Sequence, residues 1–297
     1  MGVSCLLDMR AAVGAIAALG FAATVFAQPC ADVTLRLRCL RQPAVFHRGE
    51  AIRASLSVTA TGRAGLTALP GLRRGFFHEI VSWEPRADAV DPLTLDPRIR
   101  VGDEPGSGLV TDRNREIDLN EWVQFRSSGQ YALRVRLKRF EQAWCELMSN
   151  AESIQILPPD AQWEAAELAR IVGMLGSEAT RLAGASALRY LNTRDAAVEL
   201  TQRYLRSTAG PAEAELGKGI FESQYAEVVQ AELEKALRSG APFTEDALGT
   251  LALLEVRRQF ANRPCPPEGD AARAWSREYW ALFASVKRKY EELVKRR

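Results

Sequence analysis

The chain has 297 residues and a formal net charge of +2, with 39 basic against 37 acidic residues. This balance excludes the strongly basic face of a nucleic-acid-binding protein, so no nucleic acid is expected as a partner. The length exceeds the usual size of one domain, about 100 to 200 residues, and favours two domains.

The first 27 residues have the pattern of a secretory signal peptide. Arg10 supplies a positive charge, residues 11–25 form an apolar run, and Val25-Phe26-Ala27 places small residues where signal peptidase cleaves. The run is shorter than the about 20 residues that a membrane-spanning helix needs. We expect an exported protein, periplasmic or extracellular, that begins at Gln28 and keeps no transmembrane anchor. Whether translation starts at Met1 or Met9 stays open.

Four cysteines remain after this cleavage: Cys30, Cys39, Cys145 and Cys265. An even number of cysteines in an exported protein favours disulfides, and four allow three connectivities. A metal site is not expected, because no two of them show the close spacing of a structural zinc site. A strand between Cys30 and Cys39 would hold these two cysteines too far apart to bond to each other. We therefore expect a Cys39–Cys145 disulfide. Cys30 could then pair with Cys265 only if the helices fold back towards the first strand.

Residues 28–157 predict β-strands, because apolar and polar residues alternate along three runs. The apolar positions are Val33, Leu35, Leu37 and Cys39, then Ile52, Ala54, Leu56 and Val58, then Tyr131, Leu133, Val135 and Leu137. A last short strand is expected at 152–157. Turn signals separate the runs and no helical pattern intervenes, which predicts a β-sandwich with Trp83 and Trp122 as core aromatics.

Pro158-Pro159 marks the predicted boundary between the domains, and Asp160 is suited to cap a following helix. Beyond it the period changes to 3.6 in residues 158–297. After a first amphipathic helix near 168–175, further helices are expected near 177–191, 194–206, 223–238, 244–260 and 270–296. Short linkers between them predict antiparallel neighbours, as in a bundle or a solenoid.

One helical pair resembles a HEAT-type hairpin: Ala185-x-x-Leu188-x-x-Leu191-Asn192, followed by Asp195-Ala196-Ala197-Val198 and Leu200. The β-strand half of the chain contains three further motifs: Phe46-x-x-Gly49-Glu50, Asp91-Pro92-Leu93 and Leu119-Asn120-Glu121-Trp122-Val123-x-Phe125. Together these motifs resemble uncharacterised exported bacterial proteins that combine an Ig-like β-sandwich with HEAT-like helical hairpins. The resemblance implies an α+β chain of two domains, an N-terminal antiparallel Ig-like sandwich and an all-α HEAT-like array. It carries over no catalytic residue.

Catalytic motifs are absent from the sequence. The two histidines, His47 and His78, have no G-x-S-x-G nucleophile motif near them. Carboxylates gather in one span, but without the spacing of a calcium loop and with no sign of an opposed glycosidase pair. They are Glu79, Glu84, Asp88, Asp91, Asp96, Asp103, Glu104 and Asp112. We interpret them as polar loop residues, and no cofactor is expected. The alternative is a hydrolase or accessory enzyme acting on polysaccharide or peptide through residues 79–104.

Two segments are candidates for binding. The glycine-rich loop 62–77 displays apolar and basic side chains, namely Leu69, Leu72, Arg73 and Arg74. On the last helix, Trp280 lies off the apolar stripe and would mark a partner contact if it were exposed. We therefore expect a non-enzymatic interaction or scaffold protein whose partner is a protein or another cell-envelope component. A protease inhibitor presenting the 62–77 loop is a further alternative, and the sequence leaves the ligand and oligomeric state open.

Overall fold

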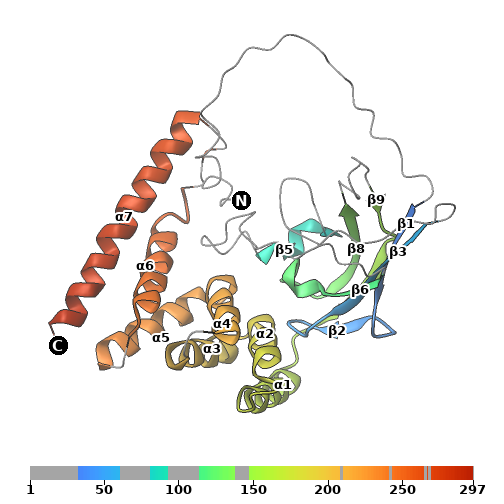
Figure 1. Ribbon diagram of the computed structural model, residues 1–297, viewed down its shortest axis with the longest axis horizontal. Helices are drawn as coiled ribbons and strands as arrows, with labels where there is room; N and C mark the ends of the chain where they lie inside the picture. The colour runs from blue at the N-terminus through green and yellow to red at the C-terminus, as the bar shows by residue number, and fades with distance from the viewer. Residues whose placement is uncertain are drawn as a thin grey trace, which may run out of the picture. The chain divides into compact units, whose positions relative to one another are not determined.

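The computed structural model describes residues 33–60, 81–92, 114–137, 147–207, 210–240, 243–263, 266 and 269–296. The fold is α+β: a region of small antiparallel and mixed sheets is followed by a helical region (Figure 1). The described residues divide between Pro159 and Asp160 into two compact units. We call residues 33–159 the β unit and residues 160–296 the helical unit.

Two small sheets make up most of the β unit. The first is antiparallel, in the order β1 (Val33–Cys39), β3 (Arg53–Ala60) and β6 (Asn114–Asp118). The second has the order β2 (Val45–His47), β10 (Glu152–Leu157), β8 (Gly129–Leu137) and β4 (Val81–Glu84), with β9 (Leu147–Met148) also on β8. The β2–β10 pairing is parallel and the others are antiparallel. A minor pair joins β5 (Ala89–Val90) to β7 (Gln124–Phe125), beside the 3₁₀ turns η2 (Arg86–Asp88) and η4 (Leu119–Glu121).

The alternating pattern of the sequence is confirmed in these strands. Side chains from both sheets form one hydrophobic core, to which β1, β3, β8 and β10 each contribute alternate residues. The buried members from these strands are Leu35, Leu37, Cys39, Ala54, Leu56, Val58, Tyr131, Leu133, Val135, Ile154 and Ile156. Trp83 and Trp122, predicted as core aromatics, are only partly buried and pack against this core.

Tyr131 ties the turn before β8 to the rest of the β unit. Its hydroxyl donates to the Ser127 carbonyl oxygen at 2.8 Å and lies 3.3 Å from the Asp88 carbonyl oxygen. The Ser127 hydroxyl in turn donates to the Asp88 carboxylate at 3.2 Å. Burial and the nearby Asp88 charge raise the pKa of Tyr131 above its usual value, although the bond to Ser127 opposes this. The hydroxyl is therefore a fixed structural donor.

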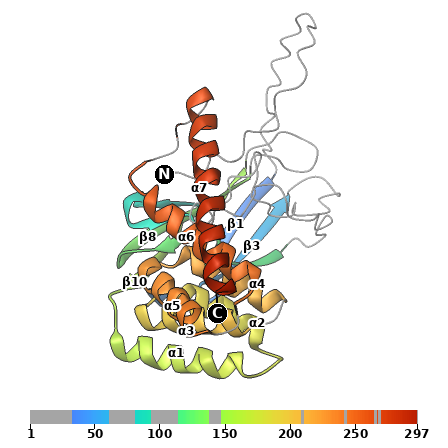
Figure 2. The same ribbon diagram turned by 90° about the vertical axis from the view of Figure 1, so that its left-hand side faces the viewer.

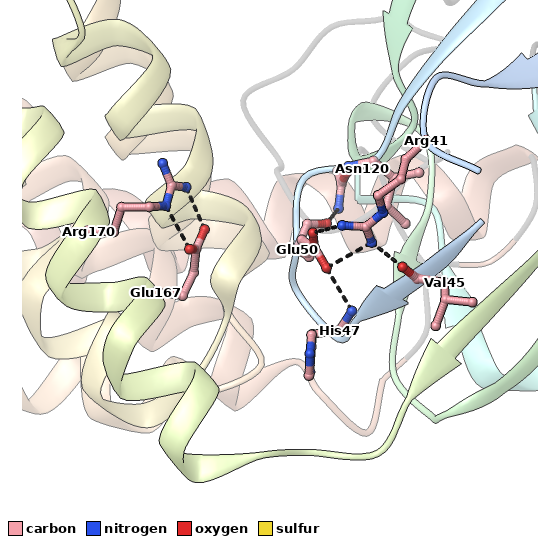
Figure 3. A network of polar contacts seen from close by, with 8 residues as sticks. Arg41, Val45, His47, Glu50, Asn120, Glu167 and Arg170 are labelled. Carbon is pink, nitrogen blue, oxygen red and sulfur yellow. Dashed lines mark hydrogen bonds and ion pairs between the residues drawn. The ribbon is translucent and has the colours of Figure 1, made fainter. Parts of the chain in front are cut away.

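Polar side chains also hold the segment between β2 and β3 (Figure 3). Arg41 forms an ion pair with Glu50, donates to the Val45 carbonyl oxygen and stacks over the Phe46 ring, 4.0 Å from its centroid. Glu50 also accepts from the His47 backbone N–H at 2.9 Å. Together these contacts restrict the conformations of the backbone between β2 and β3.

The outer edge of β1 is covered by side chains of the segment that leads into β10. Asn150 accepts from the Leu37 backbone N–H at 2.9 Å and donates to the Leu37 carbonyl oxygen at 3.0 Å. Glu152 accepts from the backbone N–H of Cys39 at 2.9 Å. An amide and a carboxylate thus satisfy backbone groups that another strand would otherwise pair.

The described helical unit contains seven helices, each shorter than 16 residues except the last. They are α1 (Ala161–Leu175), α2 (Arg181–Leu191), α3 (Arg194–Arg206), α4 (Pro211–Glu222), α5 (Ala226–Ser239), α6 (Glu245–Gln259) and α7 (Gly269–Lys295). Asp160, Thr193 and Thr244 cap three N-termini with their side-chain oxygens, as expected for these residue types. Among the described helices, none combines the length and apolar character needed to cross a membrane.

Six of the seven helices lie where the periodicity predicts them, and α4 does not. Its glycines, Gly217 and Gly219, lower helix propensity and weaken the sequence signal. Packing favours glycine at position 219, because a Cβ there would lie 3.0 Å from Leu200 Cδ1 and 3.2 Å from Arg189 Cβ, closer than most Cβ contacts. The absence of a side chain lets α4 approach α2 and α3 closely.

Each helix packs against helices that are one or two places away from it in sequence order. α1 contacts α2, α3 contacts α4, and α5 contacts α6, while α2 also packs on α4 and α3 on α5. α7 lies along α6, as the two ribbon views agree (Figures 1 and 2). Each helical pair thus stacks on the next one along the chain.

A buried ion cluster joins α2 to α4. The Arg189 side chain is only 1% exposed and binds Glu222, 3% exposed, through Nε–Oε2 and Nη2–Oε1 distances of 2.5 and 2.8 Å. Its remaining nitrogen donates to Glu215 at 2.9 Å, and Lys218 binds the same carboxylate at 2.7 Å. The bidentate geometry is the strong form of an arginine–carboxylate pair.

The pKa of another carboxylate, Glu255 on α6, allows us to predict how the stability of the fold depends on pH. Burial alone would raise the pKa of Glu255, but hydrogen bonds from Arg258, Gln259 and Gln230 outweigh burial and hold it at about 2. Because the folded-state pKa lies below the unfolded value, the ionised form stabilises the fold. That stabilisation is complete above pH 4.5 and is lost as the pH falls toward 2.

We therefore expect Glu255→Gln to lower the free energy of unfolding at pH 7 by about 1 kcal/mol, since a partly solvated carboxylate is screened. The difference from the unmodified chain should vanish near pH 2. Urea unfolding at pH 7, 4 and 2.5, followed by helical circular dichroism, measures it. Glu292→Gln, on the exposed end of α7, is the control, and an equal loss at all three pH values would contradict the prediction.

Candidate binding surface on the last helix

α7 is a long amphipathic helix that only partly buries its apolar residues. Tyr279, Val286 and Tyr290 are buried, as is the polar Ser276, whereas Trp275, Leu282 and Phe283 are partly buried against the helical core. Leu293, near the end of the helix, is 42% exposed. Trp280 lies off the packed face and is 41% exposed. The condition under which Trp280 would mark a partner contact, exposure of its side chain, is thus met in the structure, and the contact itself stays a prediction.

An aromatic cluster connects Trp280 with the core of the helical unit. The Phe260 ring meets Trp275 and Tyr279 edge-on, each with centroids 5.2 Å apart, and Trp275 stacks on Tyr279 at 5.1 Å. Trp280 then meets Tyr279 at 5.6 Å and Phe283 at 5.4 Å, both in edge geometry. Such pairs add about 0.5–1.5 kcal/mol beyond area burial. The indole of Trp280 is therefore held in place on its inner side while its outer side remains exposed.

Polar contacts fix the start of α7 beside the end of α6. The Trp275 indole N–H donates to the Arg263 carbonyl oxygen at 2.9 Å. Arg263 binds Glu278 through two nitrogen–oxygen contacts of 2.6 Å. The hydrogen bond from Arg263 lowers the pKa of Glu278 below its usual value, so the pair stays charged across the neutral range. Farther along, Lys287 binds Glu245 at 2.9 Å.

Around Trp280 lies a surface that we call the α7 outer face. Its members are Arg277, Trp280, Ala281, Ala284 and Arg288, all exposed and each one turn or less from the next. The two alanines leave the sides of the indole uncovered, and the two arginines flank it along the helix. Tryptophan and arginine are the residues that most often dominate binding energy at protein interfaces. This face can bind an apolar pocket with an acidic rim.

The other predicted binding residues are not brought to this surface by any described contact. Leu69, Leu72, Arg73 and Arg74 belong to the 62–77 loop, which lies outside the described residues. The alternative that this loop inhibits a protease stays a prediction.

Of the four cysteines, only Cys39 belongs to the part of the chain that the structure describes. Its thiol is buried in the core, and no disulfide is present among the described residues. Burial is the largest cause that raises the pKa of Cys39, to about 12, and the charge of Glu152 adds to it, so the protonated thiol is the favoured form. Cys30, Cys145 and Cys265 lie outside the described residues, and the predicted pairing of Cys39 with Cys145 stays a prediction.

Three residues of the acidic span are described: Glu84, Asp88 and Asp91. Glu84 ends β4 and is exposed, whereas Asp88 uses its carboxylate and its carbonyl oxygen to hold the turn before β8. Asp91 follows β5 and is partly buried. Among the residues described here, no group of three His, Cys, Asp or Glu side chains has the arrangement of a metal site.

One feature of the helical unit is not predicted by the sequence patterns. A cavity of about 630 Å³ opens where the α1–α2 turn meets the end of α3 and the start of α4. Its residues are distant in sequence and its arginines resemble ordinary exposed helix residues, so periodicity gives no signal for it. Only the packing of the two helical pairs brings them together.

Comparison with known proteins adds no assignment: no protein-family model and no curated protein matches this chain. The function therefore has to be argued from the geometry of the residues described above.

Proposed function

We propose that this chain is an exported, non-enzymatic interaction protein. An Ig-like β-sandwich precedes a HEAT-like array of helical hairpins, and the α7 outer face binds a protein of the cell envelope. The observation that carries the proposal is the exposed Trp280, held rigid by Tyr279 and Phe283. An aromatic side chain fixed before binding loses little conformational entropy when a partner covers it.

Two observations in the β unit support an Ig-like sandwich. The two sheets contribute their inward side chains to one shared core, as the facing layers of a sandwich do. The Tyr131 hydroxyl binds the carbonyl oxygen four residues upstream, which is the contact of a tyrosine corner. A sandwich of the two sheets would account for both the shared core and the Tyr131 contact.

The helical contacts support a HEAT-like array. In a stack of hairpins, equivalent helices of successive pairs lie side by side, which gives contacts between helices two apart in sequence. The α2–α4 and α3–α5 contacts follow this order. In such an array the last helix has a neighbour on one side only, so a face like that of α7 is left for a partner.

One residue of the acidic span, Asp88, supports a non-enzymatic role. Asp88 accepts from Ser127 and from the Arg126 backbone N–H through its carboxylate and carbonyl oxygens, respectively. A carboxylate with a structural task at a turn is a poor candidate for acid–base chemistry on a substrate. Export is supported by the signal-peptide pattern of residues 1–27.

The test is capture of a partner from the envelope fraction of the producing cells. The mature chain, whose mass should show a start at Gln28, carries a photo-crosslinking side chain at position 281 in an otherwise unchanged α7. We expect one envelope protein to be crosslinked in stoichiometric yield. Trp280→Ala should weaken its binding about 30-fold, as truncation of a hot-spot aromatic does.

Leu293→Ala is the matched control, because Leu293 lies on the same helix with almost the same exposed fraction, 42% against 41%. It should leave the affinity for that protein unchanged. Equal affinity of the Trp280→Ala and Leu293→Ala variants would contradict the proposed surface. A purified chain that turns over a polysaccharide or peptide substrate, and loses turnover on Glu84→Ala or Asp91→Ala, would contradict the non-enzymatic role.

A further inference from the structure

The cavity of the helical unit has the composition of a small-molecule site. Its volume, about 630 Å³, falls within the range of about 300–1,000 Å³ that is typical of ligand pockets. Its lining combines three leucines, Leu175, Leu182 and Leu216, with three arginines, Arg181, Arg203 and Arg206. The remaining lining comes from the α1–α2 turn, the α3–α4 connection and the first turn of α4.

The leucines give the cavity an apolar side. Leu175 and Leu216 are buried where they line the cavity, whereas Leu182 on α2 is 50% exposed. An exposed leucine beside two buried ones adds apolar surface whose contact with water is unfavourable. An aliphatic chain laid against the three side chains would remove this surface from water.

The arginines differ in how their charges are already used. Arg203 is bound to Glu199 at 2.6 Å, and Arg181 lies 3.5 Å from Glu178 in an exposed pair of the kind that contributes little. Arg206 forms no hydrogen bond or ion pair with any residue that the structure describes. Glu213 also lines the cavity, and its charge is suited to its place in the first turn of α4. Arg206 and Arg181 are therefore the groups available to an anion.

We propose that this cavity binds a small anionic amphiphile, a molecule with a carboxylate or phosphate group on an aliphatic chain. The guanidinium of Arg206, with Arg181 beside the same cavity, binds the anionic group, because arginine presents a fork of donors to such groups. The aliphatic chain lies on Leu175, Leu182 and Leu216. This site goes beyond the proposed protein-binding role of α7 and shares no residue with the α7 outer face.

Isothermal titration of the full mature chain tests the proposal with four probes. Sodium decanoate and decyl phosphate carry the two anionic groups, decanol lacks a charge, and phosphatidylglycerol vesicles present the same chemistry in a membrane. We expect the two soluble anions to bind with a stoichiometry near one and decanol to bind at least tenfold more weakly. Binding to vesicles without binding of the soluble anions would assign the arginines to a membrane surface and overturn the cavity site.

Variants locate the binding. Arg206→Gln should weaken decanoate binding about tenfold, as loss of a charge-assisted hydrogen bond does, and Leu182→Asn should weaken both anions. Arg194→Gln, at the other end of α3 and outside the cavity lining, should bind decanoate normally. All three positions are exposed, so unchanged thermal unfolding serves as the folding check. Decanol binding equal to decanoate, or affinity unaffected by both Arg206→Gln and Leu182→Asn, would overturn the proposal.

Discussion

Replacement of Arg189 by methionine is expected to lower the free energy of unfolding of the helical unit by about 3–5 kcal/mol. The change leaves Glu222 and Glu215 in place with 3% and 13% of their side-chain surfaces exposed, but without the guanidinium that binds both. A buried carboxylate that loses a bidentate guanidinium keeps the cost of desolvation and gives up its strongest hydrogen bonds. The loss should therefore exceed the worth of an ordinary ion pair.

Two further variants separate this cause from a loss of packing. Lys218→Met removes the partly exposed partner of Glu215, which water can replace, and should cost less than about 1 kcal/mol. Arg189→Met combined with Glu222→Leu removes both buried charges and should recover part of the stability. Urea unfolding of the full chain, followed at 222 nm where helices dominate, gives the values. A cost below about 1 kcal/mol for Arg189→Met would contradict the role assigned to the cluster.

The ion cluster also marks where sequence patterns stop predicting the fold. Arg189 is followed by two apolar residues in a helix that the periodicity places correctly, but a single charged residue there suggests solvent. Its burial depends on Glu222 reaching it from α4, the helix that the pattern missed. The periodicity does not predict α4 because Gly219 lowers helix propensity. Glycine suits this position because α4 approaches Leu200 and Arg189 closely there. The same packing thus weakens the local signal and buries the charge.

In the β unit, local alternation was sufficient for the strands and insufficient for their pairing. The runs at 33–39 and 152–157 coincide with β1 and β10, because a strand with one face in the core must alternate. The parallel pairing of β2 with β10 joins residues more than 100 positions apart, and three residues of β2 carry no period. Such a pairing is decided by the assembled sheet and has no local signature.

Of the two candidate binding sites, one could be predicted from the sequence and the other could not. Trp280 could be predicted, because its angle from the stripe of α7 follows from helix geometry alone. The cavity could not, since Arg181 and Arg206 belong to different helices and line one cavity only through the packing of those helices. Residues of one helix can be placed from their spacing, whereas a site built by several helices requires their packing.

Replacement of Asn120 by alanine is expected to lower the free energy of unfolding of the β unit by about 2 kcal/mol. Asn120 is buried, and its Oδ1 accepts from the Ile52 backbone N–H at 2.6 Å while its Nδ2 donates to the Glu50 carbonyl oxygen at 3.0 Å. Ile52 is itself buried, so its N–H would be left without a partner away from water. A buried unsatisfied backbone group costs about 1–3 kcal/mol.

Asn120→Asp isolates the two bonds, because a carboxylate still accepts from Ile52 but cannot donate to Glu50. Asn114→Ala is the control, since Asn114 is exposed on β6 and should cost less than about 0.5 kcal/mol. Urea unfolding followed by tryptophan fluorescence gives the total effect, and hydrogen exchange at the Ile52 amide gives the local one. We expect the Ile52 amide to lose protection in Asn120→Ala and to keep it in Asn120→Asp and Asn114→Ala, because the bond it makes is the one that the alanine removes. Retained protection in Asn120→Ala would show that another group satisfies Ile52 and that the turn between β2 and β3 is held chiefly by Arg41 and Glu50.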